Sequence, residues 1–231
     1  MPTKIQWCDE TWQPITGCTA ACPYCYCQRF IPRLMANPAT AHQYRNGFAP
    51  TCHPERLDIP SKWRKPRRIF VNSMGDLFDP GIPFAFIHKV ISQVVFIERH
   101  KYLILTKQPA RMRDIMRFYG PSGAMCDNLW LGISATNQSE LNQRLPILHD
   151  TPAAHRFLSL EPMQGPIDPL LVTFPVDWVI VGPQTGPRAV ALHPNWVRYV
   201  RDVCKAAGVP FFLKSTTLDG VEYTEFPEGL R

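Results

Sequence analysis

Short apolar runs separated by helical patterns recur along this chain and restrict its fold more than any other feature. Most of these runs do not alternate between apolar and polar residues, which is typical of parallel strands covered on both faces. Between them, Phe84 to Val95 keeps a 3.6-residue apolar period, and Trp196 to Ala207 does the same before Gly208, a good helix C-cap. The runs cover residues 68–72, 102–106, 128–134, 156–160, 177–182 and 210–214.

This alternation predicts an α/β fold, a TIM-like full or partial barrel of six to seven parallel strands joined by right-handed crossovers. The count includes a less clearly marked first strand between Lys4 and Gly17. A further helix is predicted from Gln28 to Met35. We expect a single domain over residues 1–231, with an irregular insertion at about 36–66.

The overall composition is that of a globular protein. The chain is 45% hydrophobic and 19% charged, so disorder is not indicated. No apolar run approaches the roughly 18 residues of a membrane span, and the first residues lack the layout of a signal peptide, so we expect a cytoplasmic protein with no membrane partner. The formal net charge of +6 permits an anionic partner such as nucleic acid.

Almost every predicted strand ends in polar groups. In a (βα) barrel these ends meet at one face, where active sites lie, although loops also need polar residues for their own reasons. Lys107 and Lys214 could bind a substrate carboxylate or phosphate there, or pair with Glu161 and Asp76. The basic run at 63–68 comes before a strand, so we expect it at the opposite end as a solvated edge.

Cysteines are concentrated between residues 18 and 27. Cys18, Cys22 and Cys25 have the spacing C-x3-C-x2-C, which lets one short loop place three thiolates around one iron–sulfur cube. Three ligands leave one iron open, and an open coordination position distinguishes a reactive metal site from a closed structural one. Cys8, beside Trp7, is interpreted as a small buried hydrophobic residue rather than an extra ligand.

Two other interpretations of the cysteines stay open. The loop could bind zinc in a non-catalytic nucleic-acid module, but Cys27 follows Cys25 after one residue, where zinc-binding pairs usually leave two to four. A second zinc pair is also missing downstream, where Cys52, Cys126 and Cys204 are single in the sequence. The other alternative is a redox sensor that holds a cluster without binding any further cofactor.

The cysteine spacing, with Tyr24 directly before Cys25, resembles the signature of the radical S-adenosylmethionine (radical SAM) superfamily. The resemblance implies that Cys18, Cys22 and Cys25 hold a [4Fe-4S] cluster, that the open iron binds SAM, and that Tyr24 lies against the adenine. An electron from a reductant protein such as a flavodoxin or ferredoxin would pass through the cluster and cleave SAM. The resulting 5′-deoxyadenosyl radical would abstract a hydrogen from substrate.

The resemblance also implies contacts to SAM outside the cysteine loop. In the superfamily the loop after the second strand, often Gly-Gly-Glu, holds the methionine amino group of SAM. The predicted cofactor contacts at this and the other strand ends are Tyr24, Ser73, Met74, Gly75, Asp76, Ser134, Gly182 and Gln184. The predicted catalytic residues are Lys107, Glu161 and Lys214.

A more specific resemblance covers nearly the whole chain. The chain is similar to an uncharacterised, phage-associated family of radical-SAM-like proteins over residues 4–7, 12–18, 63–74, 105–107, 130–134, 161–162 and 177–182. Members of that family often have a longer gap between the first two cysteines. They also often have an acid in the turn where this chain has Gln184, which puts an acid–base role there in doubt.

The two resemblances together predict a radical SAM enzyme of unidentified substrate, with a nucleotide or nucleic acid as a permitted class.

Overall fold

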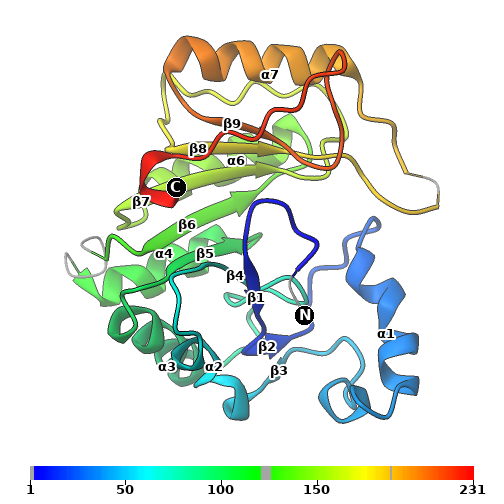
Figure 1. The fold of residues 1–231 in the computed structure, drawn as a ribbon, viewed down its shortest axis with the longest axis vertical. Helices are drawn as coiled ribbons and strands as arrows, with labels where there is room; N and C mark the ends of the chain where they lie inside the picture. Colours follow the sequence, from blue (N-terminus) through cyan, green and yellow to red (C-terminus); the bar gives the residue numbers. More distant parts are fainter. Residues whose placement is uncertain (1–2, 121–125, 188) are drawn as a thin grey trace.

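The computed structural model describes residues 3–120, 126–187 and 189–231, and its centre is one curved sheet of parallel strands (Figure 1). The sheet has seven strands and forms an incomplete barrel, which confirms the predicted α/β partial barrel. In spatial order the strands are β1 (Glu10–Trp12), β4 (Arg68–Val71), β5 (Lys101–Thr106), β6 (Leu129–Ser134), β7 (His155–Leu160), β8 (Trp178–Val181) and β9 (Phe211–Leu213).

Helices lie between most consecutive strands of the sheet and cover its outer face (Figure 1). Two predicted helices are confirmed as α3 (Phe84–Phe96) and α7 (Pro194–Ala207). Gly208 ends α7 with a φ of 67°, a conformation that other residues adopt at a cost, so the chain turns there into β9. Within the described ranges, no helix has the length and apolar character needed to cross a membrane. Two further outer helices are α4 (Pro109–Phe118) and α6 (Gln138–His149).

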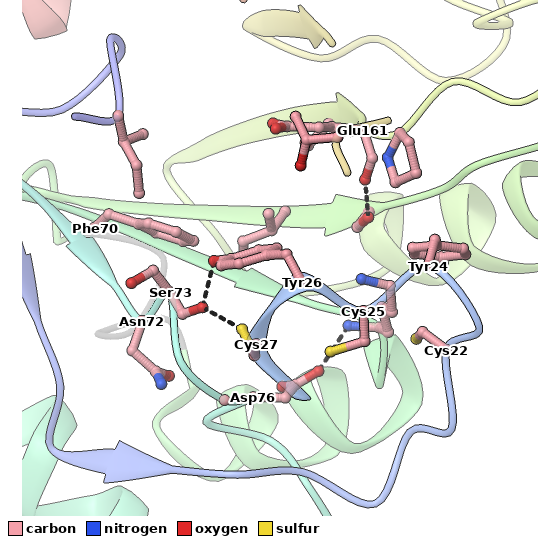
Figure 2. A pocket seen from close by; sticks show the side chains of 18 of the residues that line it. Cys22, Tyr24, Cys25, Tyr26, Cys27, Phe70, Asn72, Ser73, Asp76 and Glu161 are labelled. Atoms are coloured by element: carbon pink, nitrogen blue, oxygen red, sulfur yellow. Dashed lines mark hydrogen bonds between the residues drawn. The ribbon is translucent and has the colours of Figure 1, made fainter. Parts of the chain in front are cut away.

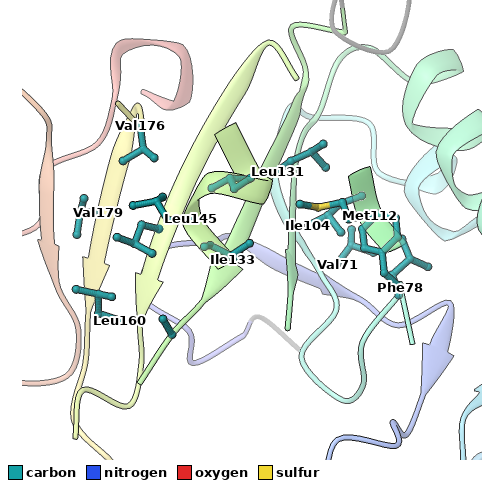
Figure 3. Packing of buried hydrophobic residues seen from close by; sticks show 14 of the residues in the cluster. Val71, Phe78, Ile104, Met112, Leu131, Ile133, Leu145, Leu160, Val176 and Val179 are labelled. Carbon is teal, nitrogen blue, oxygen red and sulfur yellow. The ribbon is translucent and has the colours of Figure 1, made fainter. Parts of the chain in front are cut away.

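The outer face of the sheet forms the larger hydrophobic core (Figure 3). Met112 of α4 and Leu145 of α6 pack with buried strand residues there. Burying an aliphatic side chain of this size contributes about 1.5–3 kcal/mol, so this layer fixes the helices on the sheet. The strand residues of this layer include Val71, Ile104, Leu131, Leu160 and Val179.

A second cluster, rich in aromatic residues, fills the inside of the barrel. The Trp178 ring lies 6.3 Å from Phe157 and 5.9 Å from Phe212, measured between ring centroids. The C-terminal segment adds Phe226, 5.3 Å from Trp178, and the buried Leu230 of η3 (Glu228–Leu230). The inside of the barrel is therefore packed wherever these rings lie.

The N-terminal segment spans the gap between the two edge strands, β1 and β9 (Figure 1). The ring centroid of its Trp7 lies 4.5 Å from that of Phe70 of β4 and 6.3 Å from that of Trp178 of β8. The side-chain oxygen of Gln6 accepts a hydrogen bond of 2.6 Å from the backbone N–H of Ser215, just after β9. Residues 5–8 thus close an otherwise open barrel. Cys8 is buried in this segment, as the sequence predicts.

The predicted insertion contains only short elements among its described residues, and the helix before it, α1 (Tyr26–Ala36), confirms the one predicted at 28–35. The sequence did not predict the antiparallel pairing of β2 (Ile15–Thr16) with β3, because two-residue strands are too short to show an alternating pattern. The insertion contains η1 (Ala41–Gln43), β3 (Thr51–Cys52), η2 (Pro54–Arg56) and α2 (Ile59–Lys62).

The basic run lies at the N-terminal end of β4, as predicted. Arg64 and Lys65 are exposed there. Arg68 pairs with Asp9 at 2.7 Å, which ties the start of β4 to the segment before β1.

Candidate active site at the mouth of the barrel

A cavity of about 470 Å³ opens where the strands end. It extends from the cysteine loop between β2 and α1 to the segments that follow β4 through β9. Most of the predicted site residues line it, so the fold brings together groups that are far apart in sequence. These residues are Cys18, Cys22, Tyr24, Cys25, Ser73, Gly75, Asp76, Lys107, Ser134, Glu161, Gln184 and Lys214.

The start of the cysteine loop is fixed by backbone contacts. Gly17 has a φ of 77°, and its N–H donates to the Met74 carbonyl at 2.8 Å. A Cβ at Gly17 would lie 2.4 Å from the carbonyl oxygens of Phe48 and Ala49, so only glycine fits this close approach. Two residues on, the Thr19 N–H and hydroxyl both donate to the carboxylate of Asp79, at 2.6 and 2.8 Å. Cys18 lies between these two anchors.

The thiols of the loop have different proton affinities. The neighbouring Cys27 side chain lowers the pKa of Cys25 to about 6, assisted by the backbone at Gln28 and the charge of Lys107. Burial raises the pKa of Cys18 to about 12. Because metal ligation requires a thiolate, Cys25 is better prepared than Cys18 to bind a metal.

The donor set of this loop fits an iron–sulfur cluster with one open iron. Cys18, Cys22 and Cys25 are half-buried and line the same cavity, and Figure 2 shows Cys22 and Cys25 close to each other below Tyr24. In the part of the chain that the structure describes, no three His, Cys, Asp or Glu side chains converge closely enough to hold a metal ion. A cluster on these three thiols would therefore require the loop to draw them together as it binds, and metal sites commonly form together with local folding.

Cys27 does not complete a four-cysteine zinc site in this arrangement. It is buried in the first turn of α1, and its thiol donates to the Ser73 carbonyl oxygen at 3.1 Å (Figure 2). A structural zinc ion needs four ligands in a tetrahedron. In this arrangement Cys27 therefore contacts Ser73 and is not placed as a fourth ligand beside the other three thiols.

Asp76 ties the ends of β4 and β5 together. Its carboxylate accepts hydrogen bonds from the Thr106 hydroxyl at 2.7 Å, the Lys107 N–H at 2.8 Å and the Phe78 N–H at 3.0 Å. The carboxyl group is buried, and this burial raises its pKa. Among the described residues, one of its oxygens accepts a single hydrogen bond, from Lys107, so it keeps a free lone pair in a residue that lines the cavity.

The charged strand ends form one ion pair and leave one lysine beside an aromatic ring. Lys214 after β9 forms a salt bridge with Glu161 after β7, and both side chains are 21% exposed. The Lys107 ammonium lies 5.8 Å from the centroid of the Tyr24 ring. The sequence allowed Lys107 and Lys214 to pair with Glu161 and Asp76. In the structure Lys214 pairs with Glu161, whereas Lys107 contacts Asp76 through its backbone N–H.

Met74 and Gly182, both predicted cofactor contacts, are not among the described residues that line the cavity. Met74 acts through its backbone, accepting from Gly17 and donating to the Gln13 side chain. Gly182 leaves room for Glu161, since a Cβ there would lie 3.1 Å from the Glu161 Cγ. Met74 and Gly182 thus position residues that line the cavity without lining it themselves.

Several lining residues were missed by the sequence analysis. The Tyr26 hydroxyl donates to the Ser73 carbonyl at 2.5 Å, so this oxygen already has two donors (Figure 2). Asn72 and Ser159 are buried, and each has a side-chain oxygen without a hydrogen-bond partner in the described ranges. Strand alternation could have predicted these residues. Asn72 lies two residues after Phe70, and Ser159 two residues before Glu161, so the two members of each pair face the same side of the sheet.

Comparisons with known proteins bear on the family and the fold. The model of the family described as "Protein of unknown function (DUF5131)" matches residues 2–222. The comparison with curated proteins gives no match. Among solved structures, a point mutant of spore photoproduct lyase is similar with a TM-score of 0.53 and 11% identity, over 90% of this chain and 76% of that chain.

Two further lyase structures are less similar. The lyase complexed with dinucleoside spore photoproduct gives a TM-score of 0.49 at 11% identity, over 88% of this chain and 75% of that one. A second point mutant with the same ligand gives a TM-score of 0.42 at 14% identity, over 88% of this chain and 54% of that one. At these identities the first likeness shows a shared fold and no more. The phage association inferred from sequence stays a prediction, whereas the family is shown: the chain belongs to the DUF5131 family.

Proposed function

We propose that this chain is a radical SAM enzyme with a [4Fe-4S] cluster on Cys18, Cys22 and Cys25 and SAM in the adjoining cavity. One observation carries the proposal: the three thiols of a C-x3-C-x2-C loop line a cavity at the C-terminal ends of the strands of a partial barrel. The fold shared with spore photoproduct lyase, a radical SAM enzyme, supports it.

When bound, the cluster and SAM supply a radical that abstracts hydrogen from substrate. The chain's own residues have positioning roles. The free lone pair of Asp76 is suited to an ammonium group, whereas the Ser73 carbonyl is occupied by Tyr26 and Cys27. The half-buried ring of Tyr24 offers a flat apolar surface to an adenine.

The opposite wall and the floor of the cavity limit access of water. Glu161 and Lys214 neutralise each other at the far strand ends, so the pair can orient a polar substrate group without leaving a net charge. Below them the packed rings of Phe70 and Trp7 close the cavity, which protects a reactive species from side reactions.

The direct test is anaerobic reconstitution with iron and sulfide, followed by iron and zinc analysis and an assay for 5′-deoxyadenosine after addition of reductant and SAM. We expect about four irons per chain in the parent protein and loss of iron in Cys22→Ala. Cys52→Ala is the matched control, because Cys52 is half-buried in β3 and is not among the described lining residues. Bound zinc, or iron retained in Cys22→Ala, would refute the proposal.

A redox-sensing role is the second candidate, favoured by the contact between Cys25 and Cys27. A thiol with a pKa of about 6 beside a second cysteine is the usual setting for reversible oxidation. The low pKa describes the metal-free chain, so this role predicts that oxidation of Cys25 follows loss of the cluster, and that the reconstituted cluster responds to oxidant while no 5′-deoxyadenosine forms. The same assay therefore separates the two candidates.

A further inference from the structure

Helix α1 exposes a stripe of aromatic and basic residues. Its buried side is formed by Cys27 and Ile31. Tyr26, Arg29, Phe30 and Arg33 follow the i, i+3, i+4, i+7 spacing of a single helix face, and all four are exposed. Large apolar side chains usually occupy the helix face that is turned to the core. Tyr26 and Phe30 are instead 40% and 48% exposed and contact each other on the outer face, which indicates a binding surface.

The stripe begins inside the cavity and runs outward along the helix. Tyr26 lines the cavity, and Figure 2 shows its ring extending from α1 toward Phe70. The Phe30 ring lies one turn further along, edge-on to Tyr26 with centroids 6.3 Å apart. The Arg29 guanidinium donates to the Thr185 carbonyl at 2.8 Å, which links α1 to the loop after β8 across the mouth. One end of a ligand bound along the stripe would therefore lie at the entrance to the cavity.

Both segments beside the mouth lack acidic residues. From Thr11 to Pro54 the sequence contains no Asp or Glu but includes Arg29, Arg33 and Arg45. Residues 178–201, which contain the loop after β8, also contain neither acid. Of the two carboxylates among the described lining residues, Asp76 is buried and Glu161 pairs with Lys214. The mouth is therefore a positive surface suited to an anionic partner.

We infer that the stripe of Tyr26, Arg29, Phe30 and Arg33 is a docking surface for single-stranded nucleic acid. The two arginines would pair with phosphates, and the two rings would stack with unpaired bases, the inner base lying at the entrance to the cavity. This alternation of cations and aromatic rings is how single strands are bound without reading their sequence, whereas the bases of a duplex stay stacked on each other. The inference names a partner for the proposed site but concerns binding alone, so it does not depend on the radical chemistry.

The test is the fluorescence anisotropy of a labelled 12-nucleotide oligothymidine with the full chain, without SAM, between 50 and 200 mM salt. We expect Phe30→Ala to weaken binding roughly 5- to 150-fold, the loss typical of one stacked base. Replacing both Arg29 and Arg33 by Gln should reduce the steepness of the log–log salt dependence by about 1.4, because each phosphate contact on a single strand contributes about 0.7.

The matched control replaces Arg64 and Lys65 by Gln, because they are exposed, carry the same charge and lie at the opposite end of the barrel. This double variant should bind like the parent, and a duplex of equal length should bind more weakly than the single strand. Equal weakening by the control pair, tighter binding of the duplex, or equal displacement by poly-L-glutamate would overturn the inference.

Two features keep the result interpretable. Arg33→Gln alone, together with Phe30→Ala, avoids the contact of Arg29 with Thr185 and guards against a local folding defect. Because affinity is measured without SAM turnover, loss of the binding result leaves the proposed enzyme untouched. Failure to form 5′-deoxyadenosine likewise leaves the binding result standing.

Discussion

The packed interior of the barrel and its mouth are built from the same strands but have opposite characters. The interior contains the rings of Trp130, Phe157, Trp178 and Phe212, joined by Phe226 from the C-terminal segment. The mouth holds thiols, hydroxyls, an ion pair and a buried carboxylate around a cavity. A few residues along a strand thus separate a region that stabilises the fold from a region that can carry chemistry.

Strand alternation produces this contrast. Trp130 and Ser134 are four residues apart and lie on the same face of β6, and Phe212 and Lys214 are two apart at the end of β9. Each strand thus presents an aromatic ring to the interior and a polar group to the mouth. Substitutions in the interior should cost stability, whereas substitutions at the mouth should mainly change chemistry.

The largest expected effect is in the interior. Trp178→Ala removes a fully buried ring and its indole hydrogen bond of 2.9 Å to the Glu225 carbonyl, so the free energy of unfolding should fall by about 3–5 kcal/mol. Urea denaturation followed by circular dichroism measures the loss. Val172→Ala, at a side chain that is 96% exposed, is the control and should change little. A loss below about 1 kcal/mol would show that the interior is not the stabilising region.

A smaller effect is expected at the mouth, from Asp76→Ala. The substitution leaves donors from Thr106, Lys107 and Phe78 without their acceptor, and should lower the free energy of unfolding by about 1–3 kcal/mol.

This loss should depend on pH. Burial raises the pKa of Asp76, so the native state binds the proton more tightly than the unfolded state, whose pKa is about 3.9. The stabilisation by Asp76 is then greatest below about pH 4 and decreases as pH rises through the native pKa. Unfolding of parent and variant at pH 4 and pH 7 tests the sign, and a larger difference at pH 7 would contradict it.

The smallest effect on stability is expected from changes to the thiols of the cysteine loop, where reactivity should change instead. In metal-free protein, alkylation of Cys25 by iodoacetamide should reach half its maximal rate near pH 6, because the Cys27 contact stabilises the thiolate. Buried Cys204, with a pKa raised to about 12 by burial, should stay unmodified until the protein unfolds. Mass spectrometry of digests reads both sites. In Cys27→Ala the midpoint for Cys25 should move upward, and an unchanged midpoint would remove Cys27 as the cause.

The strands were predictable because parallel strands covered on both faces leave uninterrupted apolar runs, as in β5 and β6. The edge strand β1 was poorly marked, since it has three residues and only Trp12 among them is buried. The pairing of β2 with β3 depends on contacts across the insertion, which no local pattern records.

The site was predictable where spacing or strand ends marked it, as for Cys18, Cys22 and Cys25, and for the convergence of Glu161 with Lys214. Tyr26 and Cys27 were missed as lining residues, although they adjoin the cysteine motif, because only the start of α1 shows that they turn back toward Ser73. The closure of the barrel by Trp7 needed the three-dimensional arrangement of β1 and β9.

If the thiols at the mouth hold a cluster with one iron open to SAM, the cluster must sense SAM directly. Electron paramagnetic resonance of the reconstituted, reduced protein, recorded with and without SAM, detects this. We expect a reduced-cluster signal whose spectrum shifts when SAM is added, and no such signal in Cys25→Ala. A signal that is identical with and without SAM, or a colourless protein containing zinc, would contradict it.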